Sequence, residues 1–124
     1  MSNALANTIS EADLQRGVHS LLSEPSRIWK TQSGKHLQTL SPGRLNVHEG
    51  ADFLDVAILI EGEIAIGNAE FHRKASDWIS HGHSGNRNYD DLLLHLVFAH
   101  DISGSFARET LVLPADEVIE LLKN

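Results

Sequence analysis

The sequence contains no cysteine, which excludes disulfide bonds and thiolate metal sites. No apolar run approaches the roughly 20 residues that a membrane-spanning helix needs, so a membrane partner is not expected. The N-terminus lacks the basic and apolar regions of a signal peptide, and we predict a cytoplasmic protein. Residues 1–4 resemble an expression-vector remnant, so the predicted single domain spans residues 5–124.

Basic residues are scarce: 10 lysines and arginines stand against 17 acidic residues, which gives a formal net charge of −7. This balance argues against nonspecific nucleic-acid binding, because such binding needs a basic surface. It remains compatible with a local basic patch or an acidic metal site, since metal ligands add to the negative count. The sequence predicts no oligomeric state.

The hydrophobic pattern predicts an α/β or α+β fold, with a mixed sheet of about four or five strands and helices at both termini. An amphipathic helix is expected from Ser10 to Ser23, with Ser10 as its N-cap and Pro25 beyond its end. A central hairpin, a nearly all-apolar strand that we place inside the sheet, and a C-terminal helix are also expected. The pattern further indicates a short hairpin before the central one and a short strand after the apolar strand. The predicted ranges are 28–31 and 36–40 for a short hairpin, 52–60 and 64–72 for the central hairpin, 92–99 for the apolar strand, 109–113 for a further strand and 114–123 for the helix.

The register of the central hairpin decides which side chains share a face. A three-residue loop, Glu61-Gly62-Glu63, places Ile60 opposite Ile64. One face then carries an apolar floor with three polar side chains at its open end. The floor is Leu54, Val56, Ile58, Ile60, Ile64 and Ile66, and the polar side chains are Asp52, Glu70 and His72.

A two-residue loop is the alternative register. It would place Asp55 near Asn68 and Glu70, with Phe53 opposite Glu70. We favour the first register because it groups apolar residues with apolar residues and polar residues with polar ones.

Two carboxylates, Asp52 and Glu70, at one end of an apolar face repel each other and are poorly solvated. A divalent cation would supply the missing counter-charge, and oxygen ligands suit Mg²⁺ or Mn²⁺. His72 lies on the same face as Glu70 and could orient or deprotonate an attacking water. The alternative interpretation is structural, because strand ends are often polar where they emerge into water.

These residues also resemble the signature of the PD-(D/E)XK nucleases, in which an acid begins one strand and an acid-x-lysine tripeptide lies on the next. The resemblance implies a restriction-endonuclease-like fold that cleaves nucleic acid, with Asp52 and Glu70 as metal ligands and with Glu70 and His72 as catalytic residues. Ala51 stands where the signature has proline, and His72 stands where it has lysine. An imidazole cannot fully replace an ammonium group, so the alternative is a catalytically inactive binding or assembly module on the same fold.

A larger set of motifs resembles a bacterial family, domain of unknown function 2851. The motifs are Gly50-Ala51-Asp52-Phe53-Leu54-Asp55, Gly67-Asn68-Ala69-Glu70-Phe71-His72, Ser76-Asp77-Trp78, His81-Gly82-His83 and the segment 89–97. They follow one another in this order between Trp29 and Asp101. Members of that family are several times longer, so this chain resembles their N-terminal portion.

Other groups could carry chemistry. His81 and His83, with Asp77, His95 or His100, could bind Zn²⁺ and serve a zinc hydrolase, although solvated loop histidines are the commoner case. We interpret His95, inside an apolar strand, as a core histidine.

Two further groups could lie near the hairpin. Glu11 or Glu24 could supply an additional acid from the first helix, and a solvated helix face is the alternative. Four basic residues could form a phosphate-facing patch near the hairpin end, or be ordinary surface charge: Arg44, Arg73, Lys74 and Arg87.

Overall fold

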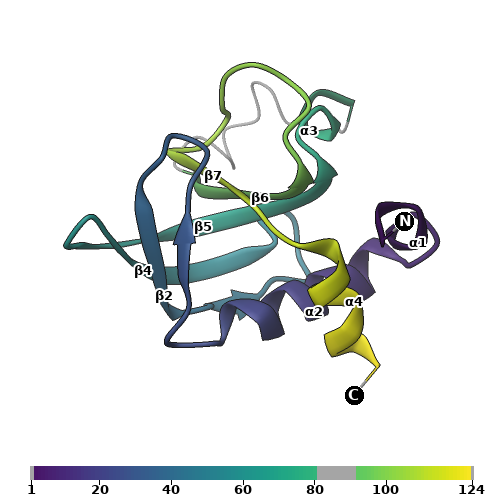
Figure 1. Ribbon diagram of the computed structural model, residues 1–124, viewed down its shortest axis with the longest axis horizontal. Helices are drawn as coiled ribbons and strands as arrows, with labels where there is room; N and C mark the ends of the chain where they lie inside the picture. The colour runs from purple at the N-terminus through teal and green to yellow at the C-terminus, as the bar shows by residue number, and fades with distance from the viewer. Residues whose placement is uncertain (1, 81–91, 124) are drawn as a thin grey trace.

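The computed structural model describes residues 2–80 and 92–123 (Figure 1). Within these ranges one mixed sheet of seven strands is flanked by helices, which confirms the predicted fold class, although the four or five strands expected were too few. The helices are α1 (Ser2–Ala6), α2 (Glu11–Leu22), α3 (Asp77–Ser80) and α4 (Ala115–Leu122). The strands are β1 (Ile28–Lys30), β2 (His36–Ser41), β3 (Arg44–Leu45), β4 (Phe53–Ile60), β5 (Glu63–Lys74), β6 (Leu92–Ala99) and β7 (Glu109–Val112).

The strand order is β1-β2-β4-β5-β6-β7, and β3 pairs with β4 beside β2. The strands from β1 to β5 pair antiparallel, whereas β6 runs parallel to both β5 and β7. β6 therefore lies inside the sheet, as its apolar sequence predicts. We expected residues 44–50 to be irregular, because they are polar. β3 forms there because its two residues pair with Phe53 and Leu54 at the start of β4.

The sheet curls so that its two ends meet. The turn between β1 and β2 reaches β7, where the Gln32 N–H donates a hydrogen bond of 2.8 Å to the Thr110 carbonyl oxygen. Beside it, buried Glu109 accepts from the Ser33 hydroxyl at 2.6 Å and lies 3.3 Å from the Lys35 ammonium. In Figure 1 the hairpin of β1 and β2 accordingly crosses in front of the remaining strands.

Helix α2 forms where the sequence predicts it. The Ser10 side chain accepts a hydrogen bond of 3.1 Å from the Asp13 N–H, so Ser10 is the N-cap, and Glu11 and Asp13 occupy the first turn. α4 begins after Pro114 and lies beside α2 (Figure 1). The two helices bury their apolar faces against one face of the sheet, in a core that includes Leu14, Val18, Phe53, Ile58, Phe71, Leu94, Leu96, Leu111 and Val118.

Across the part of the chain that the structure describes, no helix is both long and apolar enough to cross a lipid bilayer.

Gly17 lies where α2 and α4 come into close contact. A Cβ atom added there would lie 2.7 Å from Val118 Cγ1 and 3.0 Å from the Val118 carbonyl oxygen. Glycine has a low helix propensity, but at position 17 it is required by the packing of the two helices.

We expect Gly17→Ala to destabilise the domain. Alanine improves helix propensity by about 1 kcal/mol, but overpacking costs roughly 1–3 kcal/mol and is the larger effect. Urea unfolding should show a lower midpoint for Gly17→Ala, whereas Ser20→Ala, at an exposed position of the same helix, should change stability by less than about 0.5 kcal/mol. A more stable Gly17→Ala variant would contradict this account of the helix contact.

The register of the central hairpin differs from the one we favoured. The turn consists of two residues, Glu61 and Gly62, with φ angles of 48° and 84°, as a type I′ turn requires. Ile60 pairs with Glu63, and Leu59 pairs with Ile64. The predicted apolar floor is therefore wrong in part. Val56, Ile58 and Ile60 are buried against the helices, while Ile64 and Ile66 lie on the opposite face and are each 68% exposed.

A β-bulge then shifts the register a second time. Between Phe53 and Val56, β4 advances three positions while β5 advances two, from Gly67 to Ala69. Asp55 is the extra residue, with a φ of 59°, and its N–H donates to the Asn68 side-chain oxygen at 3.2 Å. The bulge turns Leu54 and Asp52 to the face that carries Glu70 and His72.

Candidate functional site

The three polar residues predicted to converge do lie together. Asp52 immediately precedes β4, and Glu70 and His72 lie on the neighbouring strand β5. The Asp52 N–H donates a hydrogen bond of 3.1 Å to Glu70 Oε1, and the Phe71 N–H donates one of 2.9 Å to Asp52 Oδ2. Each carboxyl group is thus held by the backbone of the other strand, so the two groups have a fixed relative position.

Glu70 is 3% exposed, and its surroundings change its protonation. Burial, repulsion by the Asp52 carboxylate and a hydrogen bond between the two side chains raise the pKa of Glu70 to about 9. The Asp52 N–H opposes this shift, and the negative charge of Glu11 adds to it. Glu70 therefore carries a proton at neutral pH. Glu11, expected as a possible additional acid on the first helix, lies close enough to act on Glu70 electrostatically.

His72 joins this group to a second histidine. It is 1% exposed, and its Nε2 lies 3.8 Å from Glu70 Oε2. Its Nδ1 forms a hydrogen bond of 2.9 Å with Nε2 of His95, which is also 1% exposed and lies on β6 directly beside Glu70. His95 is therefore a buried histidine with a polar partner, as we expected, but that partner belongs to the site.

Aromatic rings surround the two histidines. Trp78, on α3, contacts His72 and His95 edge-on, with ring centroids 6.2 and 5.4 Å away. Phe106 stacks on Trp78 at 5.0 Å. Trp78 belongs to a second, smaller apolar cluster on this face, with Ala51 and Leu92, against which Leu54, Phe106 and Ala107 pack. The site is thus polar inside and apolar on its outer side, so its electrostatic interactions are weakly screened.

Several other predicted candidates are placed elsewhere. Arg73 donates to the carbonyl oxygens of Ala6 and Ile9 and so anchors the N-terminal segment. Arg44 pairs with Asp55 at 2.8 Å, and both side chains are about two-thirds exposed, at 68% and 67%. Arg87, which we also considered for the phosphate-facing patch, lies outside the described residues, so that patch stays a prediction.

The zinc interpretation depends on His81 and His83, which lie outside the described residues. Of their possible partners, Asp77 accepts a hydrogen bond from the Lys74 N–H at 3.3 Å, and His95 is bonded to His72. In residues 2–80 and 92–123 no group of three or more histidine and carboxylate side chains could hold a metal ion. The zinc site stays a prediction.

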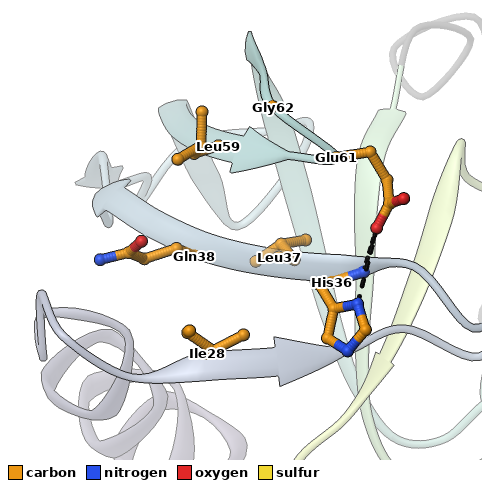
Figure 2. A pocket seen from close by; sticks show the side chains of 7 residues that line it. All are labelled: Ile28, His36, Leu37, Gln38, Leu59, Glu61 and Gly62. Carbon is orange, nitrogen blue, oxygen red and sulfur yellow. Dashed lines mark hydrogen bonds and ion pairs between the residues drawn. The ribbon is translucent and has the colours of Figure 1, made fainter.

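A shallow hollow of about 170 Å³ is lined by residues of β1, β2 and β4 and of the turn between β4 and β5 (Figure 2). Glu61 at its rim accepts a hydrogen bond of 2.8 Å from the His36 N–H. Its lining contains none of the predicted site residues; it consists of Ile28, His36, Leu37, Gln38, Leu59, Glu61 and Gly62.

Comparison with protein families identifies the family of this chain. The family described as "Protein of unknown function (DUF2851)" matches residues 23–117. The chain belongs to this family. The matched range of the DUF2851 domain contains all seven described strands and the site residues on them, whereas α1 and α2 both precede it. No curated protein and no solved structure matched the chain.

Sequence reasoning missed two features of the DUF2851 site. One is the bulge at Asp55. The only local signal for it is the residue type, because aspartate tolerates a positive φ better than most residues do. The other is the role of His95. Its contact with His72 depends on the register between the parallel strands β5 and β6, which are separated in sequence and linked by no local signal.

Proposed function

We propose that this domain is a divalent-metal-dependent phosphodiesterase acting on nucleic acid, with a restriction-endonuclease-like arrangement of its central hairpin. Asp52 and Glu70 would be the metal ligands, and His72 would assist the attacking water. The convergence of the two carboxyl groups, from neighbouring strands and on one face, is the observation that carries the proposal.

The residues present fit Mg²⁺ or Mn²⁺. Both candidate ligands are carboxylates, which hard cations prefer, and Mg²⁺ is commonly held by one or two carboxylates with water completing its shell. The raised pKa of Glu70 shows that two negative charges are not stable together here without a counter-charge. A bound cation would supply that charge and Lewis-acid polarisation of a phosphoryl oxygen.

The protein's own groups have separate tasks. The N–H groups of Asp52 and Phe71 orient the two carboxyl groups, so little rearrangement is needed when Glu70 loses its proton. His72 Nε2 lies 3.8 Å from Glu70 Oε2 and would accept the proton of the attacking water. Trp78 and Phe106 shield the histidines from bulk solvent.

A catalytically inactive nuclease-fold binding or assembly module is the second candidate. It is favoured by the burial of Glu70 and His72, which are 3% and 1% exposed, and by an imidazole where the nuclease signature has lysine. The two candidates differ in their response to metal.

Thermal unfolding with and without Mg²⁺ or Mn²⁺ tests the proposal. A cation present at 100 times its Kd adds about 2.7 kcal/mol of stability, so we expect the melting temperature to rise by several degrees. Asp52→Asn combined with Glu70→Gln should abolish that rise. Glu49→Gln combined with Asp116→Asn makes the same two amide substitutions at exposed positions and should leave the rise intact.

The outcome separates the candidates. A metal response that survives in the Asp52→Asn, Glu70→Gln variant would place the cation elsewhere. A wild-type protein that shows no response to metal and cleaves neither DNA nor RNA, single- or double-stranded, would contradict the phosphodiesterase and support the binding module.

A further inference from the structure

The hydrogen bond between His72 and His95 constrains which nitrogen of each ring carries a proton. It joins Nδ1 of His72 to Nε2 of His95 at 2.9 Å, between two side chains that are each 1% exposed. The ring planes are inclined by 84°, so one ring presents its edge to the other. Such a bond contains a single proton, which one nitrogen donates and the other accepts.

The protonated nitrogens of the two rings are consequently linked. When both rings are neutral and His72 donates from Nδ1, His95 accepts at Nε2 and carries its own proton on Nδ1. When His95 donates from Nε2, His72 accepts at Nδ1 and carries its proton on Nε2. The two mixed arrangements would place two lone pairs or two N–H groups against each other in a buried position, which is unfavourable.

His72 Nε2 is the nitrogen that faces Glu70. The state of His95 is therefore linked to whether His72 presents a lone pair or an N–H group to Glu70. We propose that His95 is a positioning residue, which fixes the ring of His72 and selects the nitrogen that it presents to Glu70. As it rests on the proposed function, the inference further specifies protons on both Nδ1 atoms, because only then can His72 Nε2 accept a proton from water.

The surroundings of His95 allow a selective variant. Its ring lies 5.4 Å from Trp78 and 6.2 Å from Phe106, both edge-on, so phenylalanine at this position keeps an aromatic ring in the cluster while it removes both ring nitrogens. His95→Gln is the complementary variant, since an amide can still donate to or accept from His72 Nδ1.

Nitrogen-15 NMR of the imidazole rings tests this directly, because it distinguishes protonated from unprotonated ring nitrogens. At a pH where both rings are neutral, we expect His72 and His95 of the wild-type protein to be protonated at the same nitrogen, Nδ1. In His95→Phe, His72 should become a mixture of the two tautomers, and His95→Gln should restore a single form. His36→Gln, at an exposed histidine, should leave the His72 signals unchanged.

Two results would overturn the inference: rings protonated at different nitrogens, or a His72 pattern that is identical in the wild-type protein and His95→Phe. Metal titration of the same wild-type sample tests the proposed function separately. A linked pair without any metal response would support the positioning role of His95 and contradict the phosphodiesterase. A metal response with unlinked rings would support the phosphodiesterase and contradict the positioning role of His95.

Discussion

Glu70→Gln is expected to stabilise the domain, and to do so increasingly as the pH rises. The pKa of Glu70 is raised to about 9 in the folded state from an ordinary 4.5, so between these values the folded protein holds a proton that the unfolded chain has released. Stability must then fall as pH rises through this window, by about 1.4 kcal/mol per pH unit for one proton. Glutamine keeps the shape of the protonated side chain and has no such dependence.

Urea unfolding between pH 5 and 9 measures this effect, a range set by the ordinary and raised pKa values of Glu70. The two proteins should have similar stability near the lower end, and Glu70→Gln should be increasingly more stable toward the upper end. If the stabilities of the two proteins change with pH in parallel, or if the variant is less stable at alkaline pH, Glu70 is already ionised in the folded protein.

Glu109 provides a matched control of opposite sign. It is also a buried carboxylate, at 4% exposed, and burial raises its pKa. The hydrogen bonds from Ser33, Thr31 and Lys35 outweigh burial and lower the pKa of Glu109 overall. The stability that Glu109 contributes is thus present above its ordinary pKa and is lost as the pH falls below it. Glu109→Gln should destabilise the domain at neutral pH, and its difference from the wild-type protein should shrink in acid.

Gly43→Ala is expected to cause the largest loss among the glycine variants considered. Gly43 has a φ of 72°, and a Cβ atom there would lie 2.2 Å from the Leu54 carbonyl oxygen and 3.0 Å from the Val56 nitrogen. Those atoms form the backbone of the bulge. The left-handed conformation costs an alanine about 1–2 kcal/mol, and the clash adds roughly 1–3 kcal/mol.

Gly34→Ala isolates the first of these costs. Gly34 has a φ of 91°, and nothing lies within 4 Å of a Cβ atom added there. Chemical unfolding should therefore show a loss of about 1–2 kcal/mol for Gly34→Ala and a clearly larger loss for Gly43→Ala. Equal losses would mean that the bulge moves away from Gly43 at no cost. A displaced bulge also moves Asp52, so the pH dependence that arises from Glu70 should change in Gly43→Ala alone.

The elements that could be predicted from the sequence are those with local causes. Ser10 as an N-cap, Pro25 beyond the helix end and the apolar run of β6 each depend on neighbouring residues, and the structure confirms all three. The grouping of Asp52, Glu70 and His72 was also predicted, but its reasoning contained an error. The turn is one residue shorter than expected, and the bulge at Asp55 adds one residue to β4. Together the two shifts move the strand pairing by two residues, which returns Asp52 to the face that carries Glu70 and His72.

The remainder depends on interactions that have no local signal. The two-residue turn was only the alternative to the register that we favoured, and it requires Glu61 to adopt a φ of 48°, which is unusual for a glutamate. Whether His95 would meet His72 depends on how β6 aligns with β5 across an intervening segment, and on α3 placing Trp78 over both rings. Both are properties of the assembled sheet.

The contact between the β1–β2 turn and β7 also bears on self-association. A terminal strand with free backbone groups can act as a template for a strand from another molecule, which is a common origin of aggregation. β7 has only four residues, and one of its outward carbonyl groups, that of Thr110, already accepts from Gln32. The polypeptide thereby occupies the border of its own sheet at which an incoming chain would otherwise add, and fibrillar growth from that border is disfavoured.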